Sequence, residues 1–253
     1  MDKGFDEYVG YVAIIDILGF TEMMQTKDNR WVYENIVLWS RETLRQLIKQ
    51  YNEEGKSCDE ENYDSGSWEA EHTPLYSMFF ADTFVLYSNS DDCSRIWSSS
   101  EFPFCGLSNI LSTFLELALK RELLLRGAIT YGRFLLGPHS TIIGRCVAEA
   151  HQLALRQNWC GIALCNGSIE LPKRTFTEYV SRYQDRSKVA PFFYPTPKLI
   201  SYRLPQKEVE YSSDMYWVID WKPDRDILLS LSSRASGAVL EKIQNTLKFA
   251  DNL

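Results

Sequence analysis

The sequence predicts an α+β fold, in which helices pack on an antiparallel sheet with a ferredoxin-like, or palm, core. Short segments rich in β-branched and aromatic residues are typical of strands, and longer segments with apolar residues at helical spacing are typical of helices. Their order along the chain is strand, helix, hairpin, helix, strand, helix, strand. This order predicts a sheet with helices on one face.

The first half of the chain begins with an expected strand over about 11–16. A long helix follows, and its apolar stripe consists of Val37, Leu44, Leu47, Ile48 and Tyr51. The polar, acidic segment 55–72 is expected to be a surface insertion or loop. The segments 75–80 and 83–88 are close enough in sequence to pair as a hairpin, with Asp82 near its tip.

In the middle of the chain, 91–104 is expected to be a loop, and a helix then runs to about Glu122. The apolar face of that helix consists of Leu107, Ile110, Leu111, Phe114 and Ala118. The strand expected over 123–131 contains Gly127, and a glycine inside a strand indicates that another backbone passes close by. Gly137 and Pro138 then mark a turn.

A third helix is expected to begin near Gly144, with Val147, Ala150 and Ala154 on one face. A short buried strand over 161–165 follows. Further strands are expected near 199–204 and 216–221, and a terminal helix over about 236–249.

Composition indicates one folded domain over 1–253, with its core at about 10–165, the insertion at 55–72 and a C-terminal extension at 166–253. The hydrophobic share is 45% and the formal net charge is -7, which argues against nucleic acid or a membrane as partner. The start of the chain is polar, no apolar run approaches the length of a membrane span, and the six cysteines form no CxxC pair. We therefore expect a cytoplasmic protein with reduced thiols.

Two acids in apolar, β-prone segments are the strongest functional signal. Asp16 ends the first expected strand and Asp82 sits at the hairpin tip, where two carboxylates could share divalent ions at a phosphate site. The backbone N–H groups that follow the first acid would face the triphosphate, and they belong to Leu18, Gly19, Phe20 and Thr21. The alternative is a structural role for both acids, Asp16 as a helix cap and Asp82 as a turn residue.

Four segments, in order, resemble motifs of the class III nucleotidyl cyclases. Asp-Ile-Leu-Gly-Phe-Thr at 16–21 is similar to their first metal motif, and Phe-Ala-Asp ending at Asp82 is similar to the second, on a hairpin. The segment 125–132 resembles their following strand, which ends in glycine. The segment 142–150 resembles the helix that supplies transition-state residues. The resemblance covers roughly residues 10–165 and implies the class III catalytic-domain fold.

Within that family the chain is most similar to the compact bacterial pyrimidine cyclases of Pycsar anti-phage systems. They share its Asp-Ile-Leu-Gly-Phe opening and its Arg-Gly-Ala-Ile strand, and their late Pro-x-Lys segment and Trp-ending strand resemble 204–207 and 216–221. The resemblance implies cyclisation of UTP or CTP to the 3′,5′-cyclic nucleotide and pyrophosphate, with UTP favoured. The product would be a second messenger for a separate effector in bacterial anti-phage defence.

The resemblance also implies roles for particular residues. Asp16, Asp82 and the Ile17 carbonyl would hold two Mn²⁺ or Mg²⁺ ions, which activate the ribose 3′-hydroxyl and neutralise the leaving pyrophosphate. Lys207 is the candidate for a further phosphate contact, with a solvated turn lysine as its alternative reading. Because class III sites form between two catalytic domains, a homodimer with composite sites is expected, both metal acids of each site coming from one chain.

The chain departs from the family at the transition-state pair, an Asn and an Arg four apart. Ala148 and Gln152 occupy those positions. A guanidinium would then have to come from another arginine, and Arg145 and Arg156 rank ahead of Arg133.

A second departure concerns base recognition. The purine-reading lysine and acid of the family align with Met78 and Thr141, which argues against adenylate or guanylate cyclase activity. Met78, Phe80 and Thr141 are therefore candidates for the base pocket, with core packing as the alternative for the first two.

Two other functions are compatible with the sequence. A catalytically impaired cyclase-like domain could act as a nucleotide sensor, which the missing Asn/Arg pair favours. Another palm enzyme is the second, but the chain lacks the Gly-Gly-Asp/Glu-Glu-Phe hairpin of diguanylate cyclases. Its acidic net charge also argues against a small polymerase.

Overall fold

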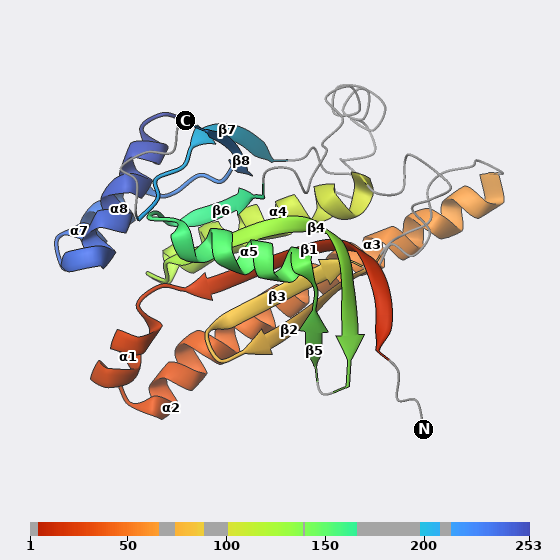
Figure 1. Cartoon of the computed structure of the whole chain (residues 1–253), viewed down its shortest axis with the longest axis horizontal. Helices are drawn as coiled ribbons and strands as arrows, with labels where there is room; N and C mark the ends of the chain where they lie inside the picture. The colour runs from red at the N-terminus through yellow and green to blue at the C-terminus, as the bar shows by residue number, and fades with distance from the viewer. Residues whose placement is uncertain (1–4, 66–73, 89–100, 139, 166–197, 208–213) are drawn as a thin grey trace.

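The computed structural model describes residues 5–65, 74–88, 101–138, 140–165, 198–207 and 214–253. Its strands form one eight-stranded sheet in the order β2-β3-β1-β4-β6-β8-β7, and β5 pairs with β4 outside this path (Figure 1). The strands are β1 (Asp6–Ile17), β2 (Leu75–Phe80), β3 (Thr83–Ser88), β4 (Leu125–Gly137), β5 (Thr141–Ile143), β6 (Gly161–Leu164), β7 (Leu199–Arg203) and β8 (Met215–Ile219). The helices are α1 (Phe20–Thr26), α2 (Asn29–Val32), the π-helix η1 (Tyr33–Leu38), α3 (Trp39–Ser65), α4 (Glu101–Lys120), α5 (Arg145–Arg156), α7 (Arg225–Ser232) and α8 (Gly237–Ala250).

The core of the sheet has the strand order of a ferredoxin-like fold. β1 lies between β3 and β4, β2 is on the outer side of β3, and all of these neighbours are antiparallel. The predicted α+β palm core is therefore confirmed. The sheet is mixed rather than purely antiparallel, because β4 and β6 are parallel. This pairing follows from α5, which carries the chain back along β4 before β6 begins.

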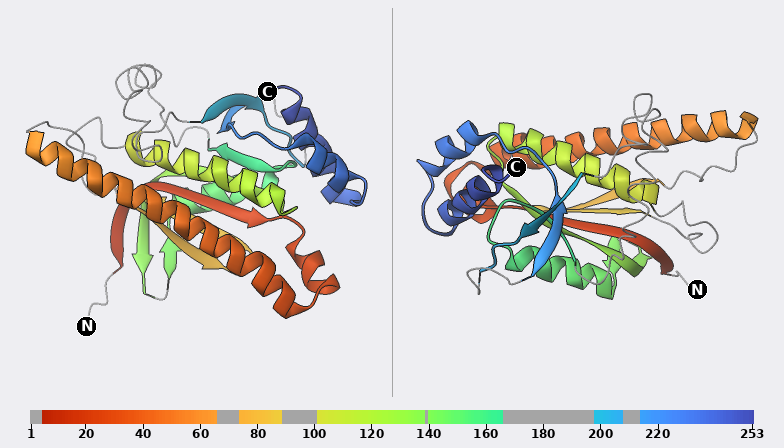
Figure 2. Two further views of the ribbon diagram at one scale, coloured as in Figure 1. Left: turned by 180° about the vertical axis from the view of Figure 1, so that it is seen from behind. Right: turned by 90° about the horizontal axis from the view of Figure 1, so that it is seen from above.

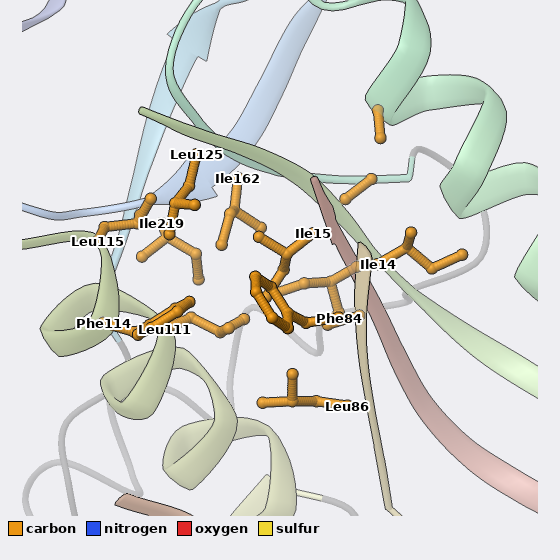
Figure 3. Packing of buried hydrophobic residues seen from close by; sticks show 14 of the residues in the cluster. Ile14, Ile15, Phe84, Leu86, Leu111, Phe114, Leu115, Leu125, Ile162 and Ile219 are labelled. Carbon is orange, nitrogen blue, oxygen red and sulfur yellow. The ribbon is translucent and has the colours of Figure 1, made fainter. Parts of the chain in front are cut away.

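Helices cover both faces of the sheet, so the expectation of helices on one face is wrong. The two views in Figure 2 show α3 and α4 on one face and α5 on the other. α5 can lie close to β4 and β1 because two of its four buried residues, Ala150 and Ala154, are small. On the opposite face, Ile15 and Phe84 of the sheet meet Phe114 of α4 in the main core (Figure 3).

The long helical region agrees with the predicted stripe, since Leu44, Ile48 and Tyr51 are buried. The expected loop at 55–72 is wrong in its first part, because α3 continues to Ser65 and 66–72 lies outside the described residues. Extending an existing helix costs far less than nucleating a new one, so a polar segment can continue it. In the same way, α4 begins at Glu101, before the expected loop end at 104, while 91–100 lies outside the description.

The predicted hairpin is confirmed at both strands. β4 continues to Gly137, past the expected end at 131, because its second half pairs with the start of β1. β5 and α7 were not predicted. Four cysteines of the described residues, Cys105, Cys146, Cys160 and Cys165, are buried and form no disulfide. Within the described residues, no helix combines the length and apolarity needed to cross a membrane.

Gly127 occupies the close backbone approach that the sequence predicts. A Cβ atom placed on it would lie 2.5 Å from the carbonyl oxygen of Ile14 in β1. Only a glycine allows β1 and β4 to come together at this point. Gly127 pairs with Ile15, and the adjacent pair of the two strands is Asp16 with Arg126.

Candidate functional site

Asp16 and Asp82 lie side by side at one end of the sheet. Asp16 pairs with Thr83 across β1 and β3, and the Thr83 hydroxyl donates a 2.8 Å hydrogen bond to its Oδ1. The N–H of Ile17 donates to the carbonyl oxygen of Asp82 at 3.1 Å. The hairpin places Asp82 there by turning at Ala81, which has a left-handed φ of 51°. Two acids that are far apart in sequence therefore come from neighbouring backbone positions.

Arg126 of β4 faces Asp16 from the other side. The two residues form a register pair, and Nη2 of Arg126 lies 3.8 Å from Oδ2 of Asp16. Both side chains are largely buried, with 7% of the arginine and 14% of the aspartate exposed. The position was not among the predicted site residues. An arginine inside a strand that is otherwise apolar is the signal that could have found it.

The guanidinium of Arg126 is poorly satisfied for a buried cation. Its Nη1 donates long hydrogen bonds to the carbonyl oxygens of Leu155 and Gln157, at 3.4 and 3.3 Å, and its Nε is buried without a hydrogen-bond partner. Burial lowers the pKa of Arg126, and the charge of Asp16 opposes that shift.

The candidate base-pocket residues on the hairpin share the sheet face of Asp16. Phe80 pairs with Thr83, and Met78 pairs with Val85 two positions along β3, so alternation puts all four side chains on the face that carries Asp16. Phe80 is 43% exposed and Met78 is partly buried. Both can therefore meet a ligand beside the acids.

The segment after Asp16, whose amides are expected to face phosphate, turns into α1. Gly19 has a φ of 75° and precedes the first turn of α1, which Phe20 and Thr21 open. The N–H of Leu18 donates to the carbonyl oxygen of Leu124 at 2.8 Å, so this amide is engaged within the protein. Of the predicted amides, those of Gly19, Phe20 and Thr21 remain the candidates for phosphate.

Lys207 lies near the acids although it is far from them in sequence. Its N–H donates to the carbonyl oxygen of Arg156 at 2.9 Å, which ties it to the last residue of α5. Burial and the charge of Arg126 lower the pKa of Lys207, and the charge of Asp16 opposes the shift. The structure thus brings Lys207, Arg156 and Arg126 to the end of the sheet that carries both aspartates.

Thr141 and Arg145 lie at the opposite end. Thr141 pairs with Gly137, which follows Arg126 by eleven positions in β4, or roughly 35 Å of strand. Arg145 begins α5 there, is 92% exposed and donates to Glu149 at 2.8 Å. Within one chain, neither residue is close to Asp16.

The exposed surface of α5 contains the two positions at which the resemblance expects an Asn and an Arg. Ala148 and Gln152 are both exposed there. Arg133 is also exposed and forms an ion pair with Glu7 at 3.3 Å.

The acids suit a hard divalent cation that binds together with a ligand. No cluster of three or more His, Cys, Asp or Glu side chains that could hold a metal occurs in the described part of the chain. Asp16, Asp82 and the carbonyl of Ile17 would supply only oxygen donors, and too few to enclose an ion. Mg²⁺ or Mn²⁺ fits such a set, because these ions commonly take one or two carboxylates and leave other positions to phosphate oxygens and water.

Comparison with known proteins gives similarity in structure but not in sequence. No family model matches the chain, and no curated protein matches it. The catalytic core of a rhodopsin-guanylyl cyclase with converted specificity, solved in complex with ATPalphaS, is 15% identical, with a TM-score of 0.44, and the match covers 85% of this chain and 98% of that one.

Two further solved structures are similar over the same share of the chain. The monomeric guanylyl cyclase domain of the RhoGC fusion protein from the aquatic fungus Blastocladiella emersonii is 13% identical, with a TM-score of 0.40 and 97% of that chain covered. A bacterial light-regulated adenylyl cyclase is 11% identical, with a TM-score of 0.34 and 91% of that chain covered. Since these scores are low, we base the function on the residues of the site.

Proposed function

We propose that this protein is a nucleotidyl cyclase that converts a pyrimidine nucleoside triphosphate, UTP in preference to CTP, to the 3′,5′-cyclic nucleotide and pyrophosphate. The observation that supports the proposal is the placing of Asp16 and Asp82 at neighbouring backbone positions: the N–H of Ile17 donates to the carbonyl oxygen of Asp82, and the hydroxyl of Thr83 donates to Asp16. Both acids come from segments that resemble the metal motifs of class III cyclases.

In this reaction the 3′-oxygen of the ribose attacks the α-phosphorus, and the bond from that phosphorus to the bridging oxygen of the β-phosphate breaks. Asp16, Asp82 and the Ile17 carbonyl would hold two divalent ions, which supply activation of the attacking oxygen and neutralise charge on the leaving group. Thr83 orients the Asp16 carboxylate through its hydroxyl. The amides of Gly19, Phe20 and Thr21 would face the triphosphate.

The preference for a pyrimidine is supported by the hairpin. Met78 stands where the resemblance expects a purine-reading lysine, and it lies with Phe80 on the face that carries the acids. An apolar pocket wall gives no cation to a purine ring. In bacterial anti-phage defence, the cyclic product would act as a messenger on a separate effector.

A homodimer completes the proposal. Thr141 and Arg145 lie far from Asp16 within one chain, so they could serve its site only from a second copy. Arg156 ends α5 beside Lys207, at the end of the sheet that carries Asp16, so it could serve the site of its own chain. Sedimentation should show a dimer under assay conditions, and a fully active monomer would contradict this part.

Incubation of the purified protein with each of UTP, CTP, ATP and GTP in Mn²⁺, followed by chromatography, tests the activity. We expect a cyclic pyrimidine product and pyrophosphate from the wild type, and neither from Asp82→Asn. Asp226→Asn removes an exposed acid of α7 and should behave as wild type. A folded wild-type protein that consumes no nucleotide would overturn the proposal.

A catalytically impaired nucleotide sensor is the second candidate. It is favoured by the exposed Ala148 and Gln152 on α5, where the resemblance expects an Asn and an Arg. Nucleotide binding without turnover would support this candidate over the first.

A further inference from the structure

Strand β2 is an outer strand of the sheet (Figure 1), and among the described residues it pairs with β3 alone. Its first residue shows which backbone groups face away from β3. The N–H of Leu75 donates to Oδ1 of Asn52 at 3.0 Å, and the carbonyl oxygen of Leu75 accepts from Nδ2 of the same side chain at 3.0 Å. The amide of Asn52, in α3, therefore takes the place of a neighbouring strand at this one position.

The rest of that outer edge is open. In an antiparallel pair, hydrogen-bonded and non-hydrogen-bonded positions alternate, so Ser77 and Phe79 direct their N–H and C=O groups outward as Leu75 does. No other described residue forms a hydrogen bond with these four groups. The strand also contains no charged residue and no proline, which are the devices that usually block an exposed edge. Such an edge is suited to pairing with another chain.

Two arginines of α3 lie beside this edge. The guanidinium carbons of Arg41 and Arg45 are each 5.5 Å from the centre of the Phe79 ring. Neither side chain forms an ion pair with a carboxylate of the described residues, and the Nε of Arg41 is buried without a hydrogen-bond partner. Like charges one helical turn apart repel each other. A carboxylate placed between them would relieve the repulsion and supply the missing acceptor.

The opposite face of the same edge is aromatic. Side chains alternate along a strand, so Tyr76 and Phe80 lie on the face away from Phe79 and the arginines. Each of them is 43% exposed, and the Tyr76 ring stacks on Tyr87 with the ring centres 5.4 Å apart. The edge thus offers cations on one face and apolar rings on the other.

A second copy of the chain is a poor occupant of this edge. Pairing β2 with β2 would bring two arginine pairs together, and β2 has no acid to offer them. Charge complementarity instead favours a strand that carries carboxylates on the side of α3 and apolar side chains on the other side.

We propose that β2 is a docking edge for an extended segment of another protein in which acidic and apolar residues alternate. Its backbone would pair with Ser77 and Phe79, its acids with the two arginines, and its apolar side chains with Tyr76 and Phe80. This docking uses neither nucleotide nor metal, so it does not rest on the proposed function.

Fluorescence anisotropy of a labelled peptide with the full chain tests the site. The probe has about eight residues, the length of a strand, and alternates glutamate and valine. A peptide with lysine in place of glutamate is the control ligand. We expect the acidic peptide to bind, the basic one not to bind, and added salt to weaken the binding. Hydrogen exchange at the amides of Ser77 and Phe79 should be fast in the free protein and slowed by the peptide.

Two variants separate the backbone contribution from the charge contribution. Ser77→Pro removes an outward N–H and leaves the ladder with β3 intact, so it should abolish binding. Arg45→Gln should weaken binding by about tenfold, the loss expected for one charge-assisted hydrogen bond. Arg30→Gln is the matched control, because Arg30 is an exposed arginine of α2 that pairs with Glu34, and it should bind as wild type.

Several results would overturn the proposal. They are wild-type protein that does not bind the acidic peptide, equal binding of the basic peptide, and Arg45→Gln binding as tightly as wild type. Slow exchange at both amides in the free protein would show that the chain covers this edge itself. A dimer that Ser77→Pro dissociates would assign the edge to a second copy.

Discussion

Asp16 has a measurable structural role in addition to its proposed catalytic one. Its carboxylate is the charge that faces the buried guanidinium of Arg126, at 3.8 Å. The change Asp16→Asn keeps an oxygen for the hydrogen bond from Thr83 and removes the negative charge. Arg126 is then left buried with only long hydrogen bonds to two carbonyl oxygens. We therefore expect the variant to be less stable than wild type, even without metal or nucleotide.

The magnitude follows from the separation of the charges. At 3.8 Å and an effective dielectric constant of about 20, the attraction is about 4 kcal/mol. Removing one partner of a buried pair typically costs 3–5 kcal/mol, and the partial exposure of Asp16 reduces this. We expect a loss of about 2–4 kcal/mol in the free energy of unfolding. With a urea slope of about 3 kcal/mol/M, the unfolding midpoint falls by about 1 M.

Urea unfolding in EDTA, followed by tryptophan fluorescence, measures this loss, since Trp159 and Trp221 are fully buried reporters. Asp82→Asn is the matched control. The Asp82 side chain makes no hydrogen bond or ion pair with the described residues, so its removal should change stability by less than about 0.5 kcal/mol. Equal midpoints and slopes for the two variants would refute the assignment of Asp16 as the counter-ion of Arg126.

Three further outcomes are expected from the buried groups. Gly127→Ala should lower the free energy of unfolding by about 1–3 kcal/mol, because the added Cβ would lie 2.5 Å from the carbonyl oxygen of Ile14. Thermal or urea unfolding measures this loss, and an unchanged stability would show that β1 and β4 can separate. Burial raises the pKa of Cys160 to about 11, so between pH 9 and 11 only the unfolded thiol ionises. Over that range the free energy of unfolding of the wild type should fall by about 2–3 kcal/mol relative to that of Cys160→Ala. A difference between the two proteins that does not change with pH would contradict this. The lowered pKa of Lys242 means that its positive charge destabilises the folded protein at neutral pH. Lys242→Met should therefore raise the urea midpoint of the ligand-free protein at pH 7, and this gain should fade as pH approaches 10.5. A lower midpoint for the variant at pH 7 would contradict this.

Local chemistry allowed much of the fold to be predicted. The hairpin was identified from two β-prone runs separated by two residues, and both strands match the structure. Gly127 was identified because a glycine inside a strand is costly unless another backbone needs the space. Asp16 and Asp82 stood out because each interrupts an apolar run. In each case the signal lies within a few consecutive residues.

Features that depend on separate segments could not be predicted in this way. The parallel pairing of β4 and β6, and the position of α5 on the second face, depend on how a crossover packs. The extension of α3 to Ser65 could not be predicted, because that segment has no apolar residues at helical spacing.

The surroundings of Arg126 are the clearest example of this limit. Arg126 and Lys242 belong to a strand and a helix more than a hundred positions apart, and the unusual arginine in its apolar strand does not indicate which distant residues pack around it. They become neighbours only because both elements pack against the connection between α5 and β6. Propensity and periodicity act over a few residues, so they identify strands, turns and single unusual residues. The electrostatic environment of a side chain is a sum over everything packed around it, and only the folded chain defines that sum.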